Sequence, residues 1–171
     1  MKTLVLGVGN VLLSDEGIGV KVIEEFVNRY DVPEDVEVID GGTLGLNLLY
    51  FLEKVDRLLV VDALFGGGPP GSLYKFKGDQ VRTYFKRRKL SAHDIGLQEV
   101  LGVAELIGKG PKEIVVIGVE PESLDVSLDL SPSVGGALER LLNEVVEQLK
   151  EWGIKVKVKD EAYKLKGTSS P

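Results

Sequence analysis

This 171-residue sequence contains no cysteine and only one histidine, and none of its apolar runs approaches the ~18 residues of a membrane-spanning helix. Without cysteine the chain can form no disulfide, no thiolate metal site and no cysteine nucleophile. A net charge of −6 argues against a face for duplex DNA, so we expect no nucleic-acid partner. The first residues enter a predicted strand without a signal-peptide pattern, which predicts a cytoplasmic protein.

Thermolabile residues are also few: methionine occurs once and cysteine is absent, whereas Lys, Glu and Val are frequent. This composition is typical of proteins from thermophiles, and we expect a hot source.

Apolar segments alternate with helical patterns along most of the chain, which predicts an α/β fold. The expected order is strand 3–6, helix 14–30, strand 36–39, helix 44–54, strand 57–61, edge or antiparallel strand 73–76, a helix from 91 to 107, strand 113–119 and a final helix from 131 to 152. Ser14, Ser91 and Ser131 are the predicted N-caps, the last followed by Pro132. We therefore expect three layers: a twisted, mostly parallel central sheet with helices on both faces and one antiparallel or edge strand.

The chain divides by composition near its C-terminus. Residues 1–153 carry the strand and helix pattern and are predicted to form a single α/β domain. Residues 154–171 alternate lysine with valine and then become polar, so this extension is expected either to add an edge strand or to stay loose.

A glycine-rich loop, Gly7 to Gly19, follows the first strand and leads into the first helix. Its simplest interpretation is a tight turn that lets the helix approach the sheet. A dinucleotide-binding loop is an alternative, with Asp40 as the ribose-binding acid, but Leu12 occupies the third glycine position of that motif. A phospho-receiver domain also places acids after strands one and three. Glu120, however, stands where that domain needs a phosphate-pairing lysine.

A metal site is the interpretation in which position and chemistry agree. Glu16 and His93 fall in the first turns of predicted helices, and Asp62 follows a buried strand. The helix dipole favours a carboxylate there and disfavours imidazolium, and neutral imidazole is the form that binds metal. The carboxyl ends of parallel strands meet at one rim, so Glu16, Asp62 and His93 form a candidate site for a borderline ion such as nickel or zinc with an open coordination position.

A basic run, Lys86-Arg87-Arg88-Lys89, precedes the lone histidine. Such a run is usually a solvated face. The alternative is an electrostatic guide for an acidic partner segment.

Several separated motifs together resemble one known family, the endopeptidases that mature the large subunit of [NiFe] hydrogenases. The matching segments are Gly7-Val8-Gly9-Asn10, Asp15-Glu16-Gly17-Ile18-Gly19, Asp40-Gly41-Gly42-Thr43, Val61-Asp62-Ala63, Ser91-Ala92-His93-Asp94, Gly118-Val119-Glu120-Pro121-Glu122-Ser123 and Leu130-Ser131-Pro132. The resemblance covers residues 1–152, whereas the tail after Gly153 is not part of it.

This resemblance implies a function that the residues alone do not establish. Such proteins remove a C-terminal extension from the hydrogenase large-subunit precursor after nickel insertion, so the precursor is the expected partner. The family's metal ligands fall on Glu16, Asp62 and His93, and Asp40 matches a position implicated in activity. Nickel carried by the substrate protein would then be the recognition signal, and the isolated protein need hold no metal.

Peptide hydrolysis at such a site has two open routes. The metal can polarise the water or the carbonyl, or a carboxylate such as Asp40 or Glu16 can act as general base. A binding module that senses the metal without cutting is the alternative to an enzyme.

Overall fold

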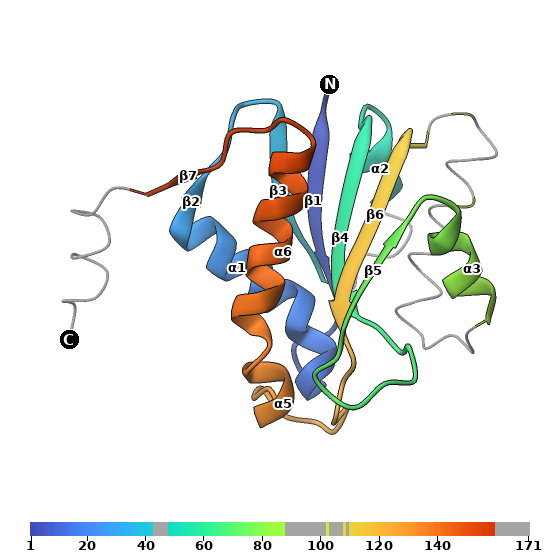
Figure 1. The fold of residues 1–171 in the computed structure, drawn as a ribbon, viewed down its shortest axis with the longest axis vertical. Coiled ribbons are helices and arrows are strands. Elements are labelled where there is room, and N and C mark those ends of the chain that lie inside the picture. Colours follow the sequence, from blue (N-terminus) through green and yellow to red (C-terminus); the bar gives the residue numbers. More distant parts are fainter. Residues whose placement is uncertain (43–47, 88–101, 103–107, 109, 160–171) are drawn as a thin grey trace.

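Four strands of the computed structural model run parallel, and a fifth lies antiparallel at one edge of the same sheet (Figure 1). The structure describes residues 1–42, 48–87, 102, 108 and 110–159. The strand order is β3-β1-β4-β6-β5. The described elements are β1 (Thr3–Val8), the 3-10 helix η1 (Ser14–Gly17), α1 (Ile18–Arg29), β2 (Tyr30–Asp31), β3 (Val36–Gly42), α2 (Leu48–Leu52), β4 (Arg57–Ala63), β5 (Leu73–Lys77), α3 (Asp79–Arg87), β6 (Glu113–Val119), α5 (Pro132–Gly135), α6 (Leu138–Glu151) and β7 (Lys157–Val158).

Helices cover both faces of the sheet, and alternation along the strands supplies each face with its own apolar core. On β4, Leu59 and Val61 join the core beneath α1 and α6, while Leu58 and Val60 join the core beneath α2 and α3. Figure 1 shows α1 and α6 together in front of the strands. The predicted three-layer α/β fold is confirmed, including the antiparallel edge strand β5.

The order of the strands creates a switch point between β1 and β4. The chain leaves β1 through α1 to reach β3 on one side, and then crosses through α2 to β4 on the other side of β1. At such a point the loops that follow the two strands diverge, and ligands of open α/β sheets bind in the crevice between them. The sheet therefore assigns its binding rim to the carboxyl ends of β1 and β4.

The predicted cap of the first helix is wrong. Ser14 has a φ of 53° and begins η1, while α1 starts only at Ile18 with Gly17 as its N-cap. The reason is tertiary: the Ser14 N–H and hydroxyl donate to the carbonyls of Ser127 and Asp125, so both are used between loops. Glu16 therefore lies in η1 and not in the first turn of α1.

Other boundaries also differ from the sequence prediction. The second predicted strand continues through Asp40 to Gly42, and α3 was not predicted. Ser131 does cap a helix with Pro132 at its first position, but this helix, α5, ends at Gly135 and is followed by the separate helix α6. The predicted helix from 91 to 107 lies almost wholly outside the described residues.

The C-terminal segment pairs away from the main sheet. β7 lies antiparallel to β2, the two residues that follow α1. This pairing is a two-stranded sheet of its own, and the division into a domain of residues 1–153 and an extension of residues 154–171 stays a prediction. Within the described part of the chain, no helix combines the length and the apolar character that a bilayer crossing requires.

Candidate functional site

Two glycines let the first helix approach the sheet at the rim. A methyl group on Gly19 would lie 2.1 Å from the carbonyl oxygen of Val61 and 2.6 Å from that of Val8. A methyl group on Gly7 would lie 2.5 Å from the carbonyl oxygen of Gly19. Because all three obstacles are backbone atoms that cannot rotate away, only glycine fits. The simplest interpretation of the glycine-rich loop, a close helix–sheet approach, is therefore confirmed.

A third glycine brings Glu16 and Asp62 to the same place. Gly9 has a φ of 129°, and a methyl group there would lie 1.8 Å from the carbonyl oxygen of Glu16 and 3.6 Å from Oδ1 of Asp62. The 3-10 helix η1 accordingly packs against β4, which carries Asp62. The backbone of Glu16 and the carboxylate of Asp62 therefore both lie against Gly9 at the switch point.

Both carboxylates are withdrawn from solvent. Glu16 is 7% exposed and Asp62 is 2% exposed. Oδ1 of Asp62 accepts the N–H of Ala63 at 2.8 Å, which fixes the orientation of the carboxylate. Burying a carboxylate is unfavourable unless hydrogen bonds or a cation balance its charge.

Asp40 reaches the same rim from β3, but it is exposed. Its backbone pairs with Gly7 of β1, and a bulge then shifts the register so that Val8 pairs with Gly42. The exposed Asp40 remains at the edge of the crevice. His93, the third predicted metal ligand, lies outside the described residues. Among the residues that the structure does describe, no three potential ligands cluster as a metal site requires.

Asp15 has a structural role that the sequence analysis did not predict. It is fully buried, and its Oδ2 accepts the N–H groups of Glu122 and Ser123 at 2.8 and 2.9 Å and the hydroxyl of Ser131 at 2.8 Å. Its Oδ1 accepts the N–H of Ser131, also at 2.8 Å.

These contacts also decide the charge state of Asp15. Burial by itself raises the pKa of its carboxyl, but the hydrogen bonds from Ser123, Ser131 and Glu122 outweigh burial and hold the pKa below its ordinary value. Asp15 is thus an anion that ties η1 to the loop after β6. The adjacent acid, Glu16, is held in place by the same anchor.

Glu120 fixes a second loop beside the rim. Its Oε1 accepts the N–H groups of Gly66 and Gly67 at 3.0 and 2.9 Å and the hydroxyl of Tyr74 at 2.8 Å. Burial and the hydrogen bond to Glu120 raise the pKa of Tyr74. Glu120, which argues against a phospho-receiver domain, therefore holds a different loop in place, the one that follows β4 and contains Gly66 and Gly67. No local pattern in the sequence indicates this role, because Gly66 and Gly67 precede Glu120 by 54 and 53 residues.

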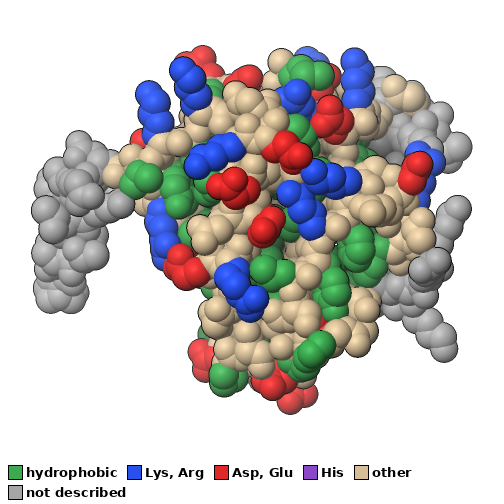
Figure 2. All heavy atoms as spheres, in the orientation of Figure 1, with side chains coloured by type: hydrophobic (Ala, Val, Ile, Leu, Met, Phe, Trp, Pro, Cys, Tyr) green, Lys and Arg blue, Asp and Glu red, His purple; other side chains and the backbone are tan. Residues whose placement is uncertain are grey.

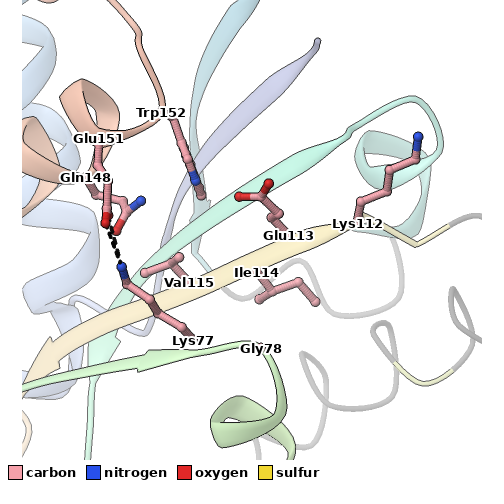
Figure 3. Close-up of a pocket in the computed structure, with 9 residues that line it drawn as sticks. All are labelled: Lys77, Gly78, Lys112, Glu113, Ile114, Val115, Gln148, Glu151 and Trp152. Atoms are coloured by element: carbon pink, nitrogen blue, oxygen red, sulfur yellow. Dashed lines mark hydrogen bonds and ion pairs between the residues drawn. The ribbon is translucent and has the colours of Figure 1, made fainter.

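The hollow drawn in Figure 3 lies at the opposite end of the sheet. It is a cavity of about 330 Å³ lined by Glu113 at the start of β6, by Trp152 and by the ion pair of Lys77 with Glu151, among others. Gln148 is 1% exposed there, and its Oε1 has no hydrogen-bond partner among the residues that the structure describes. The cavity belongs to the amino-terminal ends of the strands, so it is separate from the carboxylate rim.

Fold and site together define a doubly wound α/β protein with two buried acids, Glu16 and Asp62, at the switch point of its sheet. The family model described as HycI, hydrogenase maturation protease, matches residues 20–148 of the sequence. The hydrogenase expression/formation protein HupD of Bradyrhizobium diazoefficiens is 43% identical over 156 residues, covering 91% of this chain and 81% of that protein.

Solved structures agree with this match. The hydrogenase maturating endopeptidase HybD of E. coli superposes with a TM-score of 0.88 at 38% identity, covering 93% of this chain and 98% of that one. The [NiFe] hydrogenase maturation protease HybD of Thermococcus kodakarensis gives a TM-score of 0.68 at 26% identity, covering 87% and 99%. This chain belongs to the hydrogenase maturation protease family, and it is an endopeptidase.

Proposed function

We propose that this protein is a nickel-dependent processing endopeptidase that removes the C-terminal extension of a [NiFe] hydrogenase large-subunit precursor. The observation that carries the proposal is that the backbone of Glu16 and the carboxylate of Asp62 both lie against Gly9, at the switch point of a hydrogenase maturation protease fold. The name of the Thermococcus relative specifies a [NiFe] hydrogenase, and this supports nickel as the metal concerned.

Nickel enters this reaction as part of the substrate. Two buried carboxylates and one imidazole, His93, are too few ligands to fill a coordination sphere, and a chain without cysteine offers no thiolate. A nickel ion already bound by the precursor could take Glu16, Asp62 and His93 as additional ligands. A precursor without nickel would lack these contacts, so the metal would report that the precursor is ready for cleavage.

Hydrolysis requires a water molecule to add to the scissile carbonyl carbon, the C–N bond to break and a proton to reach the amine that leaves. The nickel can polarise the carbonyl or the water. The exposed Asp40 or the buried Glu16 can instead take the proton from the water and return it to the amine. Both routes use the same crevice and differ in which side chain kcat depends on.

Incubation with nickel-loaded and nickel-free precursor tests the proposal. We expect loss of the C-terminal peptide only from the loaded precursor, and a loss of rate of more than about 100-fold in Glu16→Gln, Asp62→Asn and His93→Ala. Asp35→Asn, at an exposed position before β3, is the control and should cleave normally. Cleavage of both precursors would remove the metal-recognition mechanism, and cleavage of neither would favour a binding module.

The Asp40→Asn variant separates the two routes. If Asp40 is the general base, kcat should fall while nickel-loaded precursor still binds, because the variant keeps every proposed metal ligand. An unchanged kcat would exclude Asp40 and leave Glu16 or the metal to activate the water.

A further inference from the structure

An exposed apolar patch lies beside the candidate crevice. It consists of Leu12, Leu124, Val126 and Leu128, which are 57, 41, 86 and 64% exposed. Single exposed apolar residues are ordinary on protein surfaces, but a group of four on two adjoining loops indicates an interaction site.

Backbone hydrogen bonds hold the two loops of this patch together. The N–H of Ser127 donates to the carbonyl of Leu12 at 3.0 Å, and the N–H of Ser14 donates to the carbonyl of Ser127 at 2.9 Å. Lys21 donates from its ammonium group to the carbonyl of Leu128. A surface that is already ordered loses little conformational entropy when a partner binds.

The same loop connects directly to the crevice. Asp15 accepts the N–H groups of Glu122 and Ser123, and its neighbour in sequence is the predicted metal ligand Glu16. Whatever binds Leu124, Val126 and Leu128 therefore approaches the crevice from the end of β6.

Acidic side chains surround the apolar ones. Glu122, Asp125 and Asp129 are exposed, and within the described ranges none of their carboxylates forms an ion pair. The lower end of the molecule in Figure 2 shows hydrophobic and acidic side chains next to one another. A partner segment that pairs with these carboxylates must carry positive charge.

We propose that the patch docks a segment of the precursor that combines apolar side chains with Lys or Arg. This inference rests on the proposed function, because it takes the precursor as the occupant. Docking at the patch would supply affinity from a region that does not react, leaving the chemistry to the crevice.

Steady-state processing of nickel-loaded precursor by Val126→Ser/Leu128→Ser tests the apolar part of this proposal. We expect KM to rise by at least about tenfold while kcat at saturation stays unchanged, because the lost contacts serve binding alone. The control is Val27→Ser/Val158→Ser, which removes two other exposed apolar side chains, 44 and 59% exposed, and should leave KM unchanged.

The triple variant Glu122→Gln/Asp125→Asn/Asp129→Asn tests the acidic part. Its KM should rise at low salt and approach the wild-type value at high salt, since exposed charges are screened there.

The outcomes distinguish this proposal from the function on which it rests. Normal wild-type processing with an unchanged KM in the apolar variant overturns the docking surface and leaves the proposed function intact. A wild-type protein that processes no loaded precursor overturns both. Dimerisation that is lost in Val126→Ser/Leu128→Ser, together with unchanged processing, would assign the patch to a second copy of this chain.

Discussion

At the scale of single residues, Asp15 is an anchor within the fold, whereas the proposed function gives its neighbour Glu16 a chemical role. Asp15 accepts three backbone N–H groups and one hydroxyl and is fully buried, so its charge is used within the fold. Glu16 is the acid whose backbone lies against Gly9, near Asp62. One acid is thus positioned by the other.

Asp15→Asn should destabilise the protein by about 2–4 kcal/mol. The amide nitrogen that replaces one carboxylate oxygen cannot accept a hydrogen bond from the N–H donors it faces, and the remaining hydrogen bonds lose the negative charge that strengthens them. Urea denaturation at neutral pH measures the change. Asp35→Asn, at an exposed site, is the matched control and should leave stability within about 0.5 kcal/mol of wild type. Equal stability of the two variants would contradict the anchoring role.

The same carboxylate predicts a pH dependence. Its folded pKa lies below its unfolded value, so between the two pKa values the unfolded chain binds more protons and stability rises with pH. The contribution of Asp15 is therefore complete above the unfolded pKa of about 3.9 and disappears as the pH falls through the folded pKa.

Denaturation of wild type and Asp15→Asn from pH 2 to 7 measures this contribution. The stability difference between them should be constant above about pH 5 and shrink below about pH 4. A difference that grows on acidification would reverse the sign of the pKa shift and refute the argument.

At the scale of elements, the close approach of α1 to β1 and β4 determines where the crevice lies. Gly19 meets the carbonyl oxygens of Val61 and Val8 at distances that leave no space for a methyl group. The helix therefore starts directly against the sheet, and η1 is held over the carboxyl end of β4.

Gly19→Ala should cost about 2–3 kcal/mol and lower processing activity, because α1 must move away from two backbone oxygens and η1 moves with it. Gly135→Ala in α5 is the control, since the added methyl group would lie 4.0 Å from Cβ of Leu130, an ordinary van der Waals contact. That control should be as stable as wild type or up to about 1 kcal/mol more stable, because alanine favours helix. Thermal denaturation and processing rates of both variants check the expectation.

At the scale of the whole molecule, charge of both signs is available for steering the precursor. The chain carries a net charge of −6, yet Lys86 to Lys89 form one basic run, and the first two of these residues end α3. Long-range fields of this kind change association rates more than they change the affinity of the final complex.

Replacing all four residues of the basic run by glutamine should slow association with the precursor about 3–10-fold at low salt, if the run guides an acidic segment. The difference should vanish above about 0.5 M salt, where the charges are screened. The control replaces four exposed lysines elsewhere by glutamine, Lys112, Lys150, Lys155 and Lys157, so that its net charge equals that of the run variant. Equal stopped-flow rates for wild type and the run variant would make the run an ordinary solvated face.

The local pattern of the sequence was sufficient to predict the fold class and part of the site. Apolar runs and glycines predicted the parallel sheet and the helix–sheet approach, because burial and steric exclusion act on each residue where it stands. The position of Asp62 at the carboxyl end of a buried strand followed from the same alternation, whereas Glu16 lies in η1 and not in the first turn of the helix where it was predicted.

Only the tertiary structure decided what depends on segments far apart in the chain. Ser14 fails as a helix cap because its N–H and hydroxyl bond to Ser127 and Asp125, more than a hundred residues later. The roles of Asp15 and Glu120 were missed for the same reason. Each carboxylate accepts backbone N–H groups of a loop that is distant in sequence, and no local pattern predicts such partners. Sequence alone determined the fold class and the order of the core strands, whereas the hydrogen bonds of buried carboxylates between distant loops decided how the rim is built.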